Sequence, residues 1–107
     1  MSKQFDVYKN PSTKTNRLWP LYLILQNNYF DDLNTRLIVP LVSQKDLNLN
    51  QKRITPQITI NKDVYYVFTP AITFIDANKI KKADFVCNVN SARHDIVSAL
   101  DSIITNT

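Results

Sequence analysis

Apolar and β-branched residues occur in short runs separated by polar segments along most of the chain. Seven runs have the two-residue alternation or the unbroken apolar character of strands, at residues 5–8, 21–26, 35–41, 54–60, 64–69, 72–75 and 85–89. Asn61-Lys62-Asp63 separates two of these runs and predicts a hairpin with a three-residue turn. Many short strands in sequence predict a β-barrel or β-sandwich.

The apolar period changes from Ser91 onward to that of a helix. The apolar positions fall on one face at i, i+4, i+7, i+8 and i+11, which are Ala92, Ile96, Ala99, Leu100 and Ile103. Ser91 or Asn90 is the predicted N-cap, and Asp95 in the first turn suits the positive end of the helix dipole. The predicted class is therefore mainly β (α+β) with one C-terminal helix, in a single domain over residues 1–107.

The polar segments predict the connections. Residues 9–16 are expected to be an exposed loop, and residues 27–34 a loop with one turn of helix. Pro40 is expected to end the third strand. Residues 43–53 are long for a hairpin and predict a short helical turn or a small side sheet, and residues 76–82 predict a basic, exposed connection.

Composition excludes several classes of function. The chain has no glycine, so Asn is expected at the turns, and every glycine-rich phosphate loop is excluded. One His and one Cys leave no histidine pair for a metal and no disulfide framework. We expect no metal, no cofactor and no catalysis. The N-terminus lacks an apolar signal region and no run could span a bilayer, which predicts a cytoplasmic protein.

The sequence predicts structural roles, and not catalytic ones, for the residues with reactive or charged side chains. His94 is expected on the helix surface, Cys87 in the core beside apolar neighbours, and Asp31 with Asp32 in solvent. Trp19 either anchors an interface or caps one end of the core. In the run 64–69, Tyr66 and Phe68 lie on one face and Tyr65 and Val67 on the other, so at least one pair is core.

The formal net charge of +4 is spread along the chain. Such a surface suits an acidic protein partner, because opposite potentials accelerate encounter. Lys79, Lys81 and Lys82 form a small basic patch that is expected to be a solvated loop rather than a phosphate track.

Several segments, in order, resemble the CcdB family, the toxins of toxin–antitoxin pairs that poison DNA gyrase. The segments are Gln4-Phe5-Asp6-Val7-Tyr8-Lys9-Asn10, Leu25-Gln26-Asn27, Asn34-Thr35-Arg36-Leu37-Ile38-Val39-Pro40-Leu41, Thr55-Pro56 with Ile58 and Ile60, and Arg93, Asp95-Ile96, Ala99-Leu100-Asp101 and Ile104 in the helix. The Thr-Arg-Leu-Ile-Val-Pro-Leu segment is the most specific of them. Together they span nearly the whole chain.

The resemblance implies an SH3-like antiparallel barrel with a small side sheet and a C-terminal helix. It also implies a homodimer that binds the gyrase A subunit without catalysing a reaction, a small acidic antitoxin, and a complex with that antitoxin on DNA that represses transcription. The gyrase contact would fall on the helix end, at Leu100, Ile103, Ile104, Thr105, Asn106 and Thr107.

The ending of this chain departs from the family pattern. Family members active on gyrase generally finish in Gly-Ile, often after an aromatic residue, whereas this chain finishes Thr105-Asn106-Thr107. Losing about a hundred square ångströms of apolar contact costs on the order of 2.5 kcal/mol. Two alternatives therefore stay open. One is a homologue that binds an antitoxin without poisoning gyrase. The other is a MazF-like ribonuclease toxin, for which Arg17, Arg36 and Thr35 supply the residue types.

Overall fold

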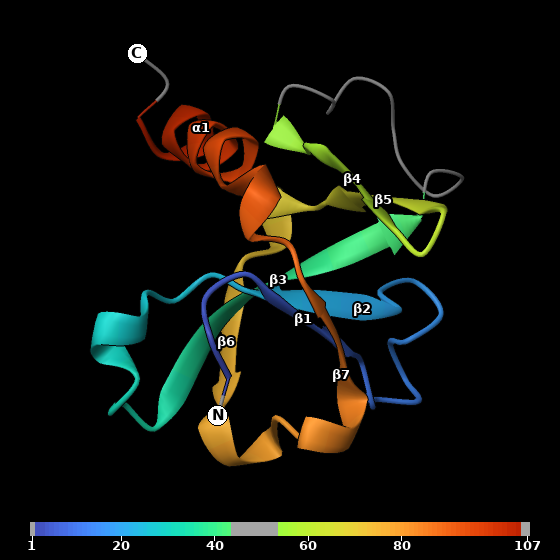
Figure 1. The fold of residues 1–107 in the computed structure, drawn as a ribbon, viewed down its shortest axis with the longest axis vertical. Coiled ribbons are helices and arrows are strands. Elements are labelled where there is room, and N and C mark those ends of the chain that lie inside the picture. Colours follow the sequence, from blue (N-terminus) through green and yellow to red (C-terminus); the bar gives the residue numbers. More distant parts are fainter. Residues whose placement is uncertain (1, 44–53, 106–107) are drawn as a thin grey trace.

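Seven antiparallel strands form one curled sheet in the computed structural model, which describes residues 2–43 and 54–105. The strands are β1 (Asp6–Lys9), β2 (Leu21–Ile24), β3 (Thr35–Ser43), β4 (Gln57–Ile60), β5 (Asp63–Val67), β6 (Thr73–Asp76) and β7 (Phe85–Asn88). Their order is β4-β5-β3-β2-β1-β7, and β6 also pairs with β3 (Figure 1). With helix α1 (Arg93–Ile104) at the C-terminal end, this half-barrel confirms the predicted mainly β (α+β) class.

Strand β3 pairs with two strands on one edge, and Pro40 lies where it changes partner. Its first half pairs with β6 and its last three residues pair with β5. The prediction that Pro40 ends the strand is wrong. The Pro40 carbonyl accepts from the Phe68 N–H at 2.9 Å. The N–H and C=O of a strand residue point to the same edge of the strand. The N–H that proline lacks would therefore have pointed toward β5 and β6, at the place where β3 changes from one to the other, so no hydrogen bond to β2 is lost.

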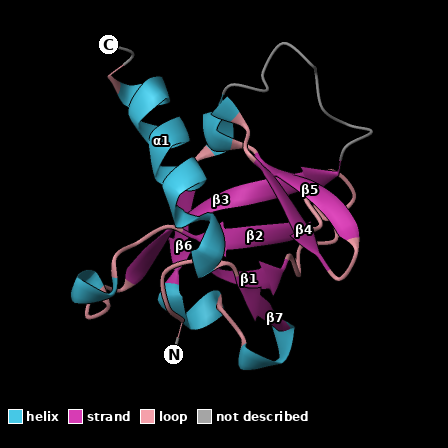
Figure 2. Ribbon diagram, turned by 45° about the horizontal axis from the view of Figure 1, so that its top comes forward, coloured by secondary structure: helices cyan, strands magenta, loops and turns pink. Residues whose placement is uncertain are grey.

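Both faces of the central strands are covered, which explains the unbroken apolar run in β2. Leu21 and Leu23 face the larger hydrophobic cluster, whereas Tyr22 and Ile24 face a second cluster with Tyr8 and Ile38. A strand that is buried on both sides has no solvent face to occupy with polar residues. The larger cluster also includes Ile96 of α1, which lies against this side of the sheet (Figure 2).

Helix α1 begins later than the sequence predicted. Arg93 is its first residue and Ala92 occupies the N-cap position without a side-chain hydrogen bond, so the predicted capping by Ser91 or Asn90 is wrong. The chain enters the helix through a 3₁₀ turn at Asn90–Ala92. The side chain of Asn88 accepts the Asn90 N–H at 2.9 Å, which places the polar cap at the start of that turn. Asp95 lies in the first helical turn as predicted.

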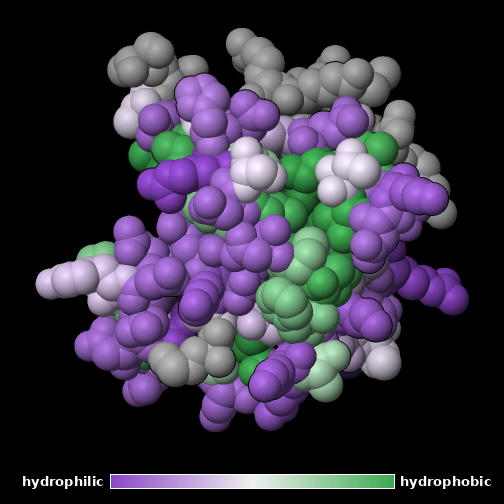
Figure 3. Space-filling model, in the orientation of Figure 1, coloured by the Kyte–Doolittle hydropathy of each residue, from purple (hydrophilic) through white to green (hydrophobic). Residues whose placement is uncertain are grey.

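The apolar stripe of α1 is buried at its centre and exposed toward its end. Ile96 and Ala99 are buried, and Leu100 packs against the larger cluster. The end of the helix extends away from the sheet (Figure 1). Hydrophobic side chains are visible on this face between α1 and the β4–β5 hairpin, whereas most of the remaining surface is hydrophilic (Figure 3).

The hairpin between β4 and β5 is confirmed, with a turn of two residues instead of three. Ile60 pairs with Asp63, so Asn61 and Lys62 alone form the turn. Both have positive φ angles, 51° and 74°, which belong to the left-handed region that glycine normally occupies. Phe5 also has a positive φ, of 69°, and precedes β1 instead of starting it, while its buried ring joins the larger cluster.

The remaining connections follow the sequence in part. Residues 27–34 contain the predicted single turn, at Asn28–Phe30, and residues 9–16 are largely exposed. The predicted basic connection contains a 3₁₀ turn at Ala77–Lys79, and another follows at Lys82–Asp84. The helical turn or side sheet predicted at 43–53 falls, apart from Ser43 in β3, outside the described residues.

Candidate functional site: the end of the C-terminal helix and a groove across the sheet

The last turns of α1 present exposed apolar side chains. Ile103 is 36% exposed and Ile104 is 75% exposed, while Leu100 is half-buried against the core. The backbone N–H and the hydroxyl of Thr105 both donate to the carbonyl of Asp101, at 2.9 and 2.7 Å, and so finish the helix. Asn106 and Thr107 lie outside the described residues.

The predicted contact residues therefore divide into two groups. Leu100 uses its side chain to hold the helix on the sheet, so little of it is available to a partner. Ile104 has no such packing to lose, and its exposed surface is available for a protein contact. A single exposed hydrophobic residue is ordinary, but two adjacent isoleucines on a projecting helix end form a small apolar tip.

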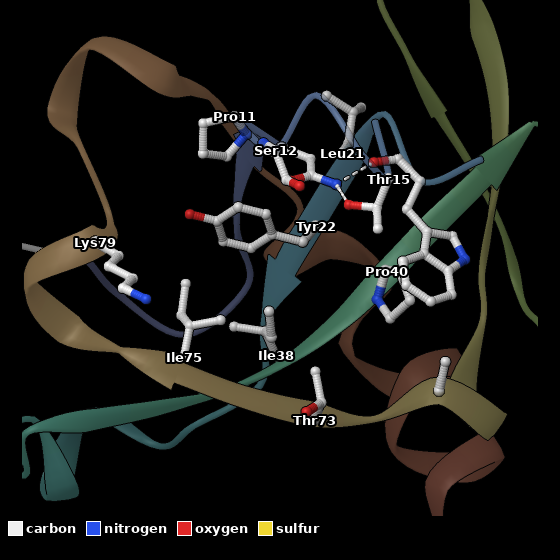
Figure 4. A pocket seen from close by; sticks show the side chains of 13 residues that line it. Pro11, Ser12, Thr15, Leu21, Tyr22, Ile38, Pro40, Thr73, Ile75 and Lys79 are labelled. Atoms are coloured by element: carbon white, nitrogen blue, oxygen red, sulfur yellow. Dashed lines mark hydrogen bonds between the residues drawn. The ribbon is translucent and has the colours of Figure 1, made fainter. Parts of the chain in front are cut away.

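A groove of about 440 Å³ lies on the side of the sheet that carries the second hydrophobic cluster (Figure 4). Its apolar lining comes from β2, β3 and β6 and from the loop before β2, and includes Trp19, Tyr22, Ile38, Pro40 and Ile75. Lys79 is the one charged residue of this lining and reaches it from the turn after β6. The groove thus combines an apolar floor with one cation.

Hydrogen bonds hold the loop that forms one wall of the groove. The Asn10 side-chain amide donates to the Thr15 hydroxyl at 2.9 Å and to the Trp19 carbonyl at 2.8 Å (Figure 4). The side-chain oxygen of Asn10 accepts the Ser12 N–H at 3.0 Å. Asn10 thus performs inside this loop the turn role that the glycine-free sequence assigns to Asn. The wall is therefore formed before any partner arrives.

Tyr22 stays neutral in the groove over the physiological pH range. Burial raises its pKa to about 12, with smaller contributions from the charges of Asp84 and Tyr8. A neutral phenol beside aliphatic side chains leaves Lys79 as the feature that selects by charge. The arrangement suits a bulky apolar side chain with a carboxylate next to it.

Sequence reasoning identified only part of this groove. The sequence predicts that Trp19 either anchors an interface or caps the core, and the structure puts it half-buried in the groove wall. The other lining residues come from the loop before β2, from β2, β3 and β6, and from turns that lie far apart in the sequence, so no local pattern brings them together. The aromatic residue beside a proline, Trp19-Pro20, was the one signal available.

The structure places the reactive residues in ordinary surroundings. His94, Asp31 and Asp32 are exposed, as predicted. Cys87 is half-buried against the larger cluster, and burial, with a smaller contribution from the charge of Asp6, raises the pKa of its thiol. Across residues 2–43 and 54–105, His, Cys, Asp and Glu form no group of three that could hold a metal ion.

The basic residues considered in the sequence do not form one surface. Lys79 lines the groove, the Lys81 ammonium donates to the Asn78 carbonyl at 3.0 Å, and Lys82 lines a different cavity. Arg36 is buried, and its guanidinium donates to backbone carbonyls of residues 31, 33 and 35. These bonds hold the guanidinium against the residues that lead into β3.

The fold is a mainly antiparallel half-barrel with one C-terminal helix, and its helix tip and groove leave apolar side chains accessible. The sequence matches the family model described as CcdB protein over residues 4–106. The chain therefore belongs to the CcdB family and is a CcdB-like toxin. Comparison with curated proteins found no match. In the part of the chain that is described, none of the helices has the length and apolar character needed to cross a membrane.

Proposed function

We propose that the chain is the toxin of a type II toxin–antitoxin module, which binds the gyrase A subunit through the end of α1 and poisons DNA gyrase without catalysing a reaction. Membership of the CcdB family supports the class. The exposed tip formed by Ile103 and Ile104 is the observation that carries the gyrase contact. The proposal places the protein in the cytoplasm with its target.

The contact in this chain rests on the isoleucines, because the residues that follow them, Thr105, Asn106 and Thr107, are polar. Burying an isoleucine side chain contributes roughly 1.5–3 kcal/mol to binding. Ile104, which is 75% exposed, supplies most of this surface, and Ile103, which is 36% exposed, adds a smaller part.

Expression of the chain alone tests the proposal. Growth should stop and DNA breaks should accumulate, and purified protein should bind the gyrase A subunit. Ile104→Asp should weaken that binding at least about tenfold, because it removes the exposed apolar contact and adds a charge. Ser102→Asp, at a residue that is also exposed on the same helix, is the matched control. Normal growth at confirmed soluble expression, without gyrase binding, would contradict the proposal.

A small acidic antitoxin is the second proposed partner, and the groove supports it. Lys79 offers a cation beside an apolar floor, and the chain carries a net charge of +4. A disordered acidic segment with an apolar anchor satisfies both features. The complex of the two proteins on operator DNA, which the family resemblance implies, belongs to the same proposal.

A homodimer is proposed from an exposed apolar pair on the sheet. Leu37 of β3 lies opposite Phe74 of β6, and both side chains are exposed. Large apolar residues that are paired and exposed mark surfaces that another chain covers.

The alternative within the family is a homologue that binds the antitoxin and leaves gyrase intact. The polar residues Thr105, Asn106 and Thr107 after the isoleucines favour it, because the groove and the helix tip are separate features and one can be retained without the other. This alternative requires antitoxin binding without binding of the gyrase A subunit. The gyrase binding measurement therefore separates the two.

A further inference from the structure

A second cavity, of about 570 Å³, lies where the N-terminal segment, β1, β3 and the turns before β7 meet. Figure 1 shows the N-terminus beside β6 and close to these turns. Lys3, Arg36 and Lys82 supply three cations to its lining, against the single carboxylate of Asp6. The cavity is distinct from the groove and from the helix end, and the proposed toxin activity does not use it.

Asp6 offsets only one of these three cations, and its carboxylate is held in place by donors of its own. It accepts the Lys3 backbone N–H at 2.8 Å, the Asn88 side-chain amide at 2.9 Å and the Tyr8 hydroxyl at 3.4 Å. The carboxylate is buried as well. Its charge is therefore stabilised locally by neutral donors, and the cavity keeps an excess of positive charge.

Arg36 is the strongest indication that the cavity accepts an anion. Its side chain is only 7% exposed, and it donates to carbonyl oxygens of Asp31, Leu33 and Thr35, all of which are neutral. The Nε has no hydrogen-bond partner among the described residues, and because this atom is itself buried, it leaves the guanidinium incompletely satisfied without facing the cavity directly. A buried guanidinium is normally paired with a carboxylate or phosphate, since an uncompensated charge is costly away from water.

One wall of the cavity is aromatic. The rings of Tyr8 and Phe85 meet edge to face, with centroids 5.6 Å apart and an interplanar angle of 73°. Both residues line the cavity, and Phe85 remains substantially exposed. A planar ring packs well against such a pair. The cavity volume lies in the range of small-molecule sites, roughly 300–1,000 Å³.

We propose that this cavity binds a small molecule in which an oxyanion is joined to a planar ring, with a nucleoside monophosphate as the representative chemistry. The phosphate lies among Lys3, Lys82 and the Arg36 guanidinium, and the ring lies against Tyr8 and Phe85. The cations select the oxyanion and the aromatic side chains select the planar ring, so the two walls together indicate a ligand that carries both groups.

Titration of the purified protein with adenosine monophosphate, followed by two-dimensional amide NMR at constant ionic strength, tests the proposal. Saturable shifts are expected at Lys3, Arg36 and Lys82, with weaker binding of inorganic phosphate and of adenosine. Lys82→Gln should weaken nucleotide binding about two- to fivefold, as expected for one partly exposed charge pair. Lys14→Gln, which removes the same charge from a loop outside the cavity, should leave it unchanged.

Three results would overturn the proposal. The first is the absence of saturable shifts at the cavity residues. The second is equal weakening by Lys82→Gln and Lys14→Gln, which would reduce the effect to general electrostatics. The third is phosphate binding as tight as nucleotide binding, which would remove the role of the aromatic wall. Arg36→Lys tests the contribution of the buried cation directly. If the Arg36→Lys protein fails to fold, the comparison of Lys82→Gln with Lys14→Gln still decides whether the cavity binds the nucleotide.

Discussion

Leu37 of β3 and Phe74 of β6 lie directly opposite one another in the register of the sheet, and 42% and 65% of their surfaces are exposed. Leu37 shares its face of β3 with Val39 and Leu41, which are fully buried in the larger cluster. The apolar face of the strand thus continues beyond the part that the rest of the chain covers. We propose that a second copy of the chain packs against Leu37 and Phe74.

Phe74→Ser is expected to convert the dimer into a monomer at micromolar concentration. The substitution removes a large exposed apolar surface without opening a cavity, so the folded chain itself should remain intact. Light scattering after size-exclusion chromatography measures the mass. Leu18→Ser, at another exposed leucine, should leave the dimer unchanged. A wild-type protein that is monomeric in this assay, or a Phe74→Ser protein that remains dimeric, would contradict the proposed interface.

Lys79→Glu is expected to weaken binding of the antitoxin encoded beside the toxin gene by about tenfold. The change replaces the cation of the groove with a charge of the same sign as the acidic partner, which costs affinity through repulsion. Calorimetric titration gives the affinity. Lys62→Glu makes the same charge change at the exposed β4–β5 turn and serves as the control. Equal losses in the two variants would show that net charge, and not the groove, controls binding.

Lys62→Gly is expected to stabilise the protein by about 0.5–1 kcal/mol. Lys62 has a φ of 74°, where a side chain with a Cβ is strained and glycine is not, although glycine gives back part of the gain through the entropy of the unfolded chain. Urea unfolding measures the change. Thr59→Gly, at an exposed position in β4, should instead destabilise. A destabilised Lys62→Gly protein would argue against the two-residue turn.

Tyr22 is expected to make the protein less stable at high pH. Its pKa is raised to about 12 in the folded protein, mainly by burial, from an ordinary value of 10. Between these values the unfolded chain loses a proton that the folded protein retains, so the free energy of unfolding falls as pH rises. Below pH 10 the contribution is complete. Tyr22→Phe should release up to one proton fewer on unfolding over this range, measured by urea unfolding at a series of pH values. An unchanged pH dependence would contradict the assignment.

Local chemistry determined much of the secondary structure from the sequence alone. The alternation in β4 and β5 and the apolar stripe around Ile96 depend on neighbouring residues, and they predicted the hairpin and the helix. The absence of glycine predicted Asn at the turns, as at Asn61, whereas the left-handed Lys62 was not predicted. The family match confirms the ordered resemblance to the CcdB family. The structure confirms the mainly antiparallel β class with one C-terminal helix that the resemblance implied.

Tertiary structure decided the features that depend on residues far apart. Pro40 stays within β3 because the strand changes partner there, which no local rule reveals. The groove exists because β2, β3 and β6 bring Tyr22, Ile38 and Ile75 to one face, and the second cavity because Arg36 and Lys82 converge on it. The burial of a side chain and the charge around it depend on all the residues that pack against it, including those far away in the sequence. The sequence therefore determined which elements form, and only their packing decided which side chains were left exposed for partners.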